Sequence, residues 1–183
     1  MNHPAERAEL PPLPSPERLQ ELFFDAARIG RDDMIPALLR AGVDMEAQDP
    51  RCYTALILAS YNGQSSTTAL LLQEGAMVDA PDGKRGNTAL MGVAFKGYDR
   101  IARMLIESGA SVDRRNAAGQ TALMNAAMFG HTAIVDLLLA HGADPHARDD
   151  AGNSPIGVAR AQGNAAMAER IEQRGVAASS VSR

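Results

Sequence analysis

The sequence predicts an all-α protein, a solenoid of five helix–turn–helix units stacked side by side. A pair of glycines twelve residues apart recurs five times along the 183-residue chain, at steps of 33 or 34 residues. A threonine or serine stands nine residues before the first glycine in four of the units. The glycine pairs are Gly30/Gly42, Gly63/Gly75, Gly97/Gly109, Gly130/Gly142 and Gly163/Gly175, and the hydroxyl residues are Thr54, Thr88, Thr121 and Ser154. Such a fixed period indicates one short supersecondary unit copied along the chain.

The clearest unit runs from residue 119 to residue 144. Residues 121–129 favour a short helix, Gly130 interrupts it, and a second helix follows and ends at Gly142, where a left-handed residue is easiest to place. Two helices this short cannot bury their apolar sides alone, so each unit needs neighbours like itself. The predicted packing positions are Ala122, Leu123, Ala126 and Ala127 in the first helix and Ile134, Val135, Leu137 and Leu138 in the second.

The residues of this unit, Thr-Ala-Leu-Met, Ala-Ala, Gly-His, Ile-Val, Leu-Leu and Gly-Ala-Asp in order, resemble the ankyrin repeat. The resemblance covers residues 19–175. It implies a right-handed stack of helix pairs with β-turn or hairpin fingers projecting between units and degenerate units capping both ends. The units are expected at about 17–47, 48–81, 82–114, 115–147 and 148–175.

The two chain ends are expected to lack regular structure. Five of the ten prolines fall in residues 1–16, which predicts a disordered proline-rich arm, with a role as a ligand for a partner as the alternative. Residues 176–183 are small and polar, which predicts a disordered tail after Gly175. In the first unit, Pro36 falls near the start of the second helix, with Asp32 or Asp33 as the candidate cap.

The second finger and the cysteine are the irregular features of the repeat. Cys52 occupies the position held by Gly86, Gly119 and Gly152 in later units. A positive φ there would cost a cysteine roughly 1 kcal/mol. Sequence drift and a redox role both account for a cysteine at this place. The extra residue of the 34-residue step lies within 80–86, where an insertion lengthens a finger and leaves the helices undisturbed.

Composition excludes several classes of protein. The formal net charge of −4 is too small to argue for a nucleic-acid or membrane partner, and a single cysteine excludes an internal disulfide. No apolar run is long enough for a signal peptide or a transmembrane helix, so we expect a cytoplasmic protein. Only 4% of residues are aromatic, which predicts an aliphatic core.

The sequence holds no recognisable catalytic or cofactor-binding motif. Residues 83–88 contain glycine and lysine without the spacing of a phosphate-binding loop, and no Gly-x-Ser-x-Gly motif occurs. His131 is expected to join the hydrogen bonds between units, and His141 to offset the helix dipole. His141 and His146 are two possible ligands without a third, which is too few for a metal or haem site. We therefore predict no catalytic residue, no metal, no cofactor and no enzymatic activity.

The remaining candidate is a surface for another protein. In an ankyrin-like stack, the fingers and the residues just before each first glycine line a concave groove. Exposed aromatic residues with methionine and a basic rim are typical of a protein-binding hot spot, and a basic face favours an acidic patch on the partner. The predicted binding residues are Arg28, Arg51, Tyr53, Tyr61, Asn62, Lys84, Arg85, Asn87, Phe95, Lys96, Arg115, Gln120, Met128, Phe129 and Arg148.

The predicted function is therefore non-enzymatic protein–protein recognition by a monomer. The resemblance is to short bacterial single-domain ankyrin proteins, some of which are associated with catalases. That leaves two alternatives open: an oxidative-stress accessory protein associated with catalase, and a cytoplasmic immunity protein that neutralises a toxin.

Overall fold

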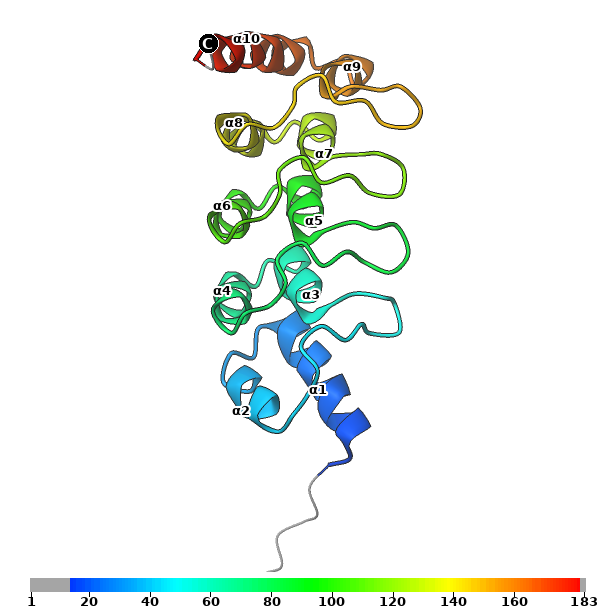
Figure 1. The fold of residues 1–183 in the computed structure, drawn as a ribbon, viewed down its shortest axis with the longest axis vertical. Coiled ribbons are helices and arrows are strands. Elements are labelled where there is room, and N and C mark those ends of the chain that lie inside the picture. The colour runs from blue at the N-terminus through cyan, green and yellow to red at the C-terminus, as the bar shows by residue number, and fades with distance from the viewer. Residues whose placement is uncertain (1–13, 182–183) are drawn as a thin grey trace, which may run out of the picture.

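The computed structural model describes residues 14–181, with side chains described through residue 175, and this part of the chain forms ten helices and no strand (Figure 1). The helices are α1 (Pro16–Ile29), α2 (Ile35–Arg40), α3 (Ala55–Tyr61), α4 (Ser65–Gln73), α5 (Ala89–Lys96), α6 (Asp99–Glu107), α7 (Ala122–Met128), α8 (Thr132–Ala140), α9 (Pro155–Ala161) and α10 (Ala165–Val181).

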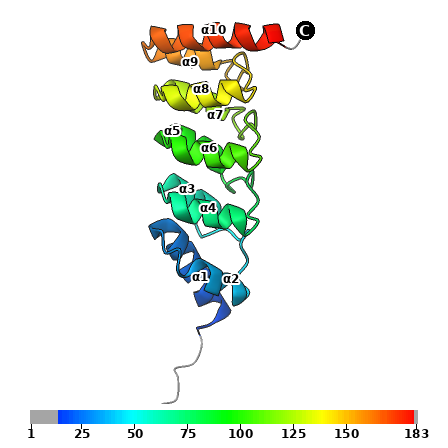
Figure 2. The same ribbon diagram turned by 90° about the vertical axis from the view of Figure 1, so that its left-hand side faces the viewer.

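The helices stand in two parallel columns that run the length of an elongated stack (Figures 1 and 2). The odd-numbered helices form the inner column, in which each helix contacts the next, and each pairs with the even-numbered helix that follows it. The loops before α3, α5, α7 and α9 all project on the same side of the inner column (Figure 1). The predicted solenoid of five helix pairs is confirmed, and we call these four loops fingers 1 to 4.

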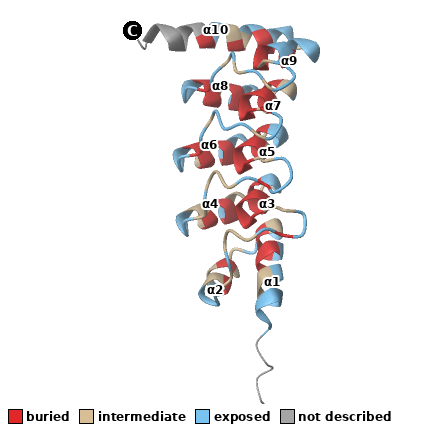
Figure 3. Cartoon of the chain, turned by 45° about the vertical axis from the view of Figure 1, so that its right-hand side comes forward, coloured by how far each residue is buried: buried red, intermediate tan, exposed pale blue. Residues whose placement is uncertain are grey.

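The core is a continuous aliphatic layer between the two columns, in which the helix sides that face neighbouring helices are buried (Figure 3). All eight predicted packing positions of the fourth unit are buried, among them Leu123 and Leu138 with no exposed surface. Each unit therefore buries its apolar sides mainly against the units beside it, as short helices require.

The recurring hydroxyl residues start the inner helices. The Thr54 Oγ1 atom accepts a hydrogen bond from the Ile57 N–H at 3.3 Å, and Thr88, Thr121 and Ser154 make the same contact at α5, α7 and α9. A side-chain oxygen at the N-cap satisfies one backbone donor that the first helical turn leaves free.

The N-terminal end differs from the prediction in two places. Helix α1 begins at Pro16, with Ser15 as its N-cap, so the predicted disordered arm of residues 1–16 is wrong for its last residues; residues 1–13 lie outside the described part of the chain. Proline suits the first helical turn because the N–H that it lacks would be unpaired there. Neither candidate cap of α2 is used, because Asp33 pairs with Arg31 and Asp32 accepts a hydrogen bond from Thr67.

The C-terminal helix also runs further than expected. Helix α10 passes through Gly175 and continues to Val181, so the predicted tail of residues 176–183 is wrong over 176–181, and residues 182–183 are not described. Gly175 has no positive φ, and a β carbon there would stand 2.7 Å from Pro145 Cγ. The left-handed turn that Gly142 makes in the preceding unit is therefore not made at Gly175. Within residues 14–181, no helix is long and apolar enough to span a membrane.

Candidate functional site

Three exposed aromatic rings form a row along the inner column. Tyr61, Phe95 and Phe129 lie at the C-terminal ends of α3, α5 and α7 and are 41%, 42% and 47% exposed. The ring centroids of Tyr61 and Phe95 are 6.4 Å apart, and those of Phe95 and Phe129 are 4.5 Å apart. We call these three rings the aromatic stripe. The stripe crosses three units without a break.

The C-terminal ends of α1 and α5 are each contacted by a side chain of the following unit. His131 Nε2 lies 3.1 Å from the Phe95 carbonyl oxygen, and Gln64 Nε2 donates to the Arg28 carbonyl at 3.2 Å. A β carbon on Gly97, where φ is +82°, would stand 2.6 Å from the His131 ring. The glycine is needed both for the left-handed turn and for this close approach. The predicted role of His131 between units is confirmed.

A cation without an ion-pair partner among the described residues, Lys96, lies beside the stripe. The Lys96 ammonium stands 5.2 Å from the centroid of the Tyr61 ring and 5.9 Å from that of Tyr98. Such cation–π contacts restrain the side chain while leaving its charge available. Arg28, at the N-terminal end of the same face, is already paired with Asp25 and with the buried carboxylate of Asp49.

Each finger is folded around one Asp or Asn side chain. The Asp82 Oδ1 atom accepts hydrogen bonds from the N–H groups of Lys84, Arg85 and Gly86. Asp49, Asn116 and Asp149 each accept two such bonds in the other fingers. In finger 4, hydrogen bonds from Asn153 lower the pKa of the Asp149 carboxyl. The bond from the Asn153 side chain has the largest effect, and the bond from its backbone N–H adds to it. The role of these four residues was not predicted from the sequence, although they recur at steps of 33, 34 and 33.

Backbone hydrogen bonds join each finger to the next. The Gly83 N–H donates to the Cys52 carbonyl at 3.0 Å, the Ala117 N–H to the Arg85 carbonyl at 2.8 Å, and the Asp150 N–H to the Ala118 carbonyl at 3.0 Å. These bonds fix the spacing of neighbouring finger tips. The four tips are therefore one continuous row rather than four independent loops.

The two irregular features of the fingers are as predicted. The φ of Cys52 is +70°, and among the described residues it is the one residue other than glycine with a positive φ. Finger 2 closes between the Asp82 N–H and the Asn87 carbonyl, whereas finger 1 closes between Asp49 and Tyr53. The extra residue of the 34-residue step is thus taken up inside finger 2.

Several predicted binding residues have structural roles instead of exposed positions at a finger tip. Tyr53 is half-buried and packs against the core. Asn87 and Gln120 are also half-buried: Asn87 donates to Asp82, and both accept a hydrogen bond from the Asn116 side chain. These three lie directly before the helix-starting threonines, where the side chain packs against the core or joins the hydrogen bonds of its finger. The prediction that they project from the fingers is wrong.

Two of the predicted arginines and one predicted groove residue make hydrogen bonds within the protein, and a second groove residue is half-buried. Arg115 donates to the Arg148 carbonyl, and Arg148 donates to the Gly152 carbonyl. Met128 is half-buried, and Asn62 donates to the Leu58 carbonyl at 2.7 Å. By contrast, Arg51, Lys84 and Arg85 are exposed, and their side chains make no hydrogen bond or ion pair within the described part of the chain.

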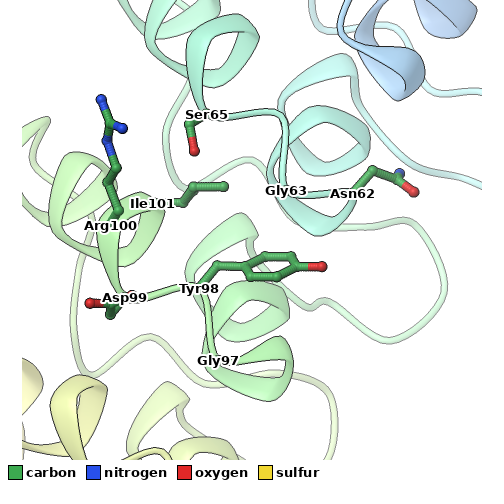
Figure 4. Close-up of a pocket in the computed structure, with 8 residues that line it drawn as sticks. All are labelled: Asn62, Gly63, Ser65, Gly97, Tyr98, Asp99, Arg100 and Ile101. Carbon is green, nitrogen blue, oxygen red and sulfur yellow. The ribbon is translucent and has the colours of Figure 1, made fainter.

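A shallow depression of about 330 Å³ lies between the turns that join α3 to α4 and α5 to α6 (Figure 4). The side chains of Tyr98 and Asp99 point in opposite directions there, so its polar groups do not converge (Figure 4). Elsewhere, His141 Nδ1 lies 2.8 Å from the Leu137 carbonyl oxygen. Among the described residues, no group of three or more His, Cys, Asp or Glu side chains is placed to hold a metal ion.

The chain matches known repeat proteins along most of the described stack. A family model of three ankyrin repeats matches residues 23–116, and a model of a single ankyrin repeat matches residues 118–150. The chain is 35% identical over 100 residues to an ankyrin repeat-containing protein of Treponema pallidum, which is 55% of this chain and 34% of that protein. It is also 34% identical over 94 residues to a transient receptor potential cation channel subfamily A member 1 homolog of Caenorhabditis elegans. The match covers 51% of this chain and 8% of that protein.

A shorter match joins the chain to palmitoyltransferase AKR1 of Saccharomyces cerevisiae, with 34% identity over 77 residues, 42% of this chain and 10% of that one. The chain thus spans about a third or less of the length of these curated relatives. With half of its length matched by the three-copy model alone, the chain belongs to the ankyrin repeat family.

Proposed function

We propose that this protein is a non-enzymatic recognition module that holds another protein against the aromatic stripe and the finger tips. Ankyrin repeats generally mediate protein–protein interactions and are generally non-enzymatic. The observation that carries the proposal is the exposure of Tyr61, Phe95 and Phe129 on one face of a chain that is poor in aromatic residues.

The physical basis is the free energy gained when these rings leave water. Large aromatic side chains contribute much of the binding energy at protein interfaces, and a row held by ring–ring contacts loses little conformational entropy on binding. Exposed large apolar side chains that lie singly need no explanation, but a contiguous row marks an interaction site.

The partner surface is proposed to be acidic. Lys96, Arg51, Lys84 and Arg85 are exposed cations without a carboxylate partner in the described residues, although the whole chain carries a net charge of −4. Complementary charge speeds association and selects among partners. We also propose that the protein acts as a monomer in the cytoplasm.

The experiment is a selection of binding peptides followed by single substitutions. Peptides from a random library displayed on phage are selected on the purified protein and measured against Phe95→Ala and Phe129→Ala. Loss of a hot-spot ring should weaken binding by about 2 kcal/mol, roughly thirtyfold, while the melting temperature stays nearly unchanged.

Met77→Ala is the matched control, since Met77 is 58% exposed and lies outside the stripe. It should bind the selected peptides like the unchanged protein. Peptides that bind Phe95→Ala and Met77→Ala equally well would show that the stripe is not the binding site.

A further inference from the structure

The finger row changes its charge from one end of the stack to the other. The tip of finger 1 carries Arg51, and the tip of finger 2 carries Lys84 and Arg85. At the matching positions, the tip of finger 3 has Ala117 and Ala118, and the tip of finger 4 has Asp150 and Ala151. The tips are thus basic, basic, neutral and acidic in order along the stack (Figure 1).

The cations near fingers 3 and 4 are bound to backbone carbonyls or lie away from the tips, and Arg148 donates to the Gly152 carbonyl of its own finger. The Arg115 side chain donates a hydrogen bond to the Arg148 carbonyl of the next finger. Gln48 of the first finger makes the equivalent bond, to the Pro81 carbonyl. Arg115 also stands 3.8 Å from Asp150. Arg114 is exposed, but it lies in the loop that leads to finger 3, two residues before Asn116, and not at the tip.

The acidic groups at fingers 1 and 2 are removed from the surface. Asp49 and Asp82 are 5% and 6% exposed, and their carboxylates accept the backbone N–H groups of their own fingers. The positive charges at these two tips therefore have no local counter-charge among the described residues. The free basic end of the finger row lies beside units 2 and 3, in which Tyr61 and Phe95 form the first part of the stripe and Lys96 lies beside it.

We infer that the partner docks in one direction, with a cluster of carboxylates on fingers 1 and 2 and an adjoining apolar segment on the aromatic stripe. This inference rests on the proposed function and adds the chemistry and orientation of the bound segment. An acidic cluster at the opposite end would meet Asp150, already paired with Arg115, instead of free cations, so the reversed orientation lacks charge complementarity. The occupant is a protein segment in which acidic residues stand to one side of bulky apolar residues.

The test uses the peptides selected on the unchanged protein and two variants with the same change in net charge. Lys84→Ala with Arg85→Ala removes two positive charges from finger 2, and Ala117→Glu with Ala118→Glu adds two negative charges to finger 3. All four positions are exposed, so both variants should fold, which melting curves will check. Arg114→Ala serves as a third variant, removing a cation that is not at a tip.

The selected peptides should contain an acidic cluster beside aromatic or branched apolar residues. The finger 2 variant should lower their affinity by about tenfold or more, and the finger 3 variant and Arg114→Ala by less than about threefold. Binding of the peptides should weaken as salt is raised from about 50 to 300 mM, and the finger 2 variant should lose most of that dependence.

Two results would overturn the inference while leaving the proposed function in place. One is equal loss of affinity in the finger 2 and finger 3 variants, and the other is selected peptides that require Phe95 but carry no acidic cluster. A set of peptides whose binding is indifferent to Phe95 would contradict the proposed function itself, and the inference with it.

Discussion

The ring of Tyr61 lies across Gly92 of the next unit. A β carbon on Gly92 would stand 3.3 Å from Tyr61 Cδ2, and the same ring stacks on Phe95 with an interplanar angle of 18°. Gly92 is inside α5 and has no positive φ, so its backbone does not require glycine. The missing side chain leaves space for the Tyr61 ring, so a glycine in the middle of a helix lets this ring of the stripe lie close to α5.

Gly92→Ala should stabilise the protein by up to about 1 kcal/mol, because alanine is the better residue in a helix interior. The contact with Tyr61 requires a shift of a few tenths of an ångström, which a ring that is 41% exposed can make. Thermal unfolding followed by circular dichroism measures the gain. In a Tyr61→Ala background the gain should be as large or larger, since the crowding is gone. A loss of stability that persists in that background would show that the ring is not what Gly92 accommodates.

Cys52→Gly should also raise the stability, for a backbone reason. A left-handed conformation costs a residue with a β carbon about 1–2 kcal/mol, and glycine loses about 0.5–1 kcal/mol more entropy on folding, so the net gain is about 1 kcal/mol. The φ of +70° at Cys52 is in this left-handed region. Urea unfolding at equilibrium measures the difference. Cys52→Ala removes the thiol and keeps the β carbon, so it should show no gain; an equal gain in both variants would point to the thiol instead.

Much of the fold could be predicted because its boundaries depend on local chemistry. A threonine N-cap and a left-handed glycine act within a few residues of themselves, so Thr88 and Gly97 mark the two ends of α5 in the sequence alone. Gly175 occupies the same motif position as Gly142 but lies inside α10. Whether a glycine at this motif position ends its helix depends on the packing around it, which is a tertiary condition that the motif does not carry.

The site was predicted only in part for the same reason. The exposure of Tyr61, Phe95 and Phe129 could be predicted because the residues before the first glycine of each unit end the inner helices. Tyr53 and Asn87 were placed wrongly because the Tyr53 side chain packs against the core and the Asn87 side chain donates a hydrogen bond to Asp82. The partial burial of these two residues depends on how fingers 1 and 2 fold around Asp49 and Asp82. The local composition does not reveal those hydrogen bonds.

Leu90→Ala and Leu123→Ala should each destabilise the protein by roughly 2–5 kcal/mol, through lost burial and the cavity left behind. Leu90 is 1% exposed and Leu123 has no exposed surface, and both lie between neighbouring inner helices. Chemical denaturation gives the free energy of unfolding. Met77→Ala, at an exposed position, should change it by less than about 0.5 kcal/mol. Similar values for all three variants would contradict the register of the units.

The last prediction concerns the C-terminal cap and its dependence on pH. Two arginines of α10 pair with Asp136 of α8: Arg170 at 2.8 and 2.6 Å, and Arg174 at 3.0 Å. The hydrogen bonds from Arg170, together with the two positive charges, lower the pKa of the Asp136 carboxyl. Helix α10 contacts α8 and α9, so this pair ties the last helix to the stack.

A carboxyl with a lowered pKa stabilises the fold while it is ionised. The stabilisation is fully present above the unfolded-state pKa of about 3.9 and is lost as the pH falls through the lower folded-state pKa. Asp136→Asn should therefore reduce stability near pH 7 by up to about 1 kcal/mol, since the arginines are partly exposed and screened by water. The difference from the unchanged protein should shrink as the pH falls below about 4.

Glu169→Gln is the matched control, because Glu169 is exposed on α10 and makes no ion pair within the described residues. Urea unfolding at a series of pH values from neutral to acid should show no such convergence for it. A constant difference between Asp136→Asn and the unchanged protein at every pH would mean that the asparagine acts through packing. The charge of Asp136 would then contribute nothing to holding α10 on the stack.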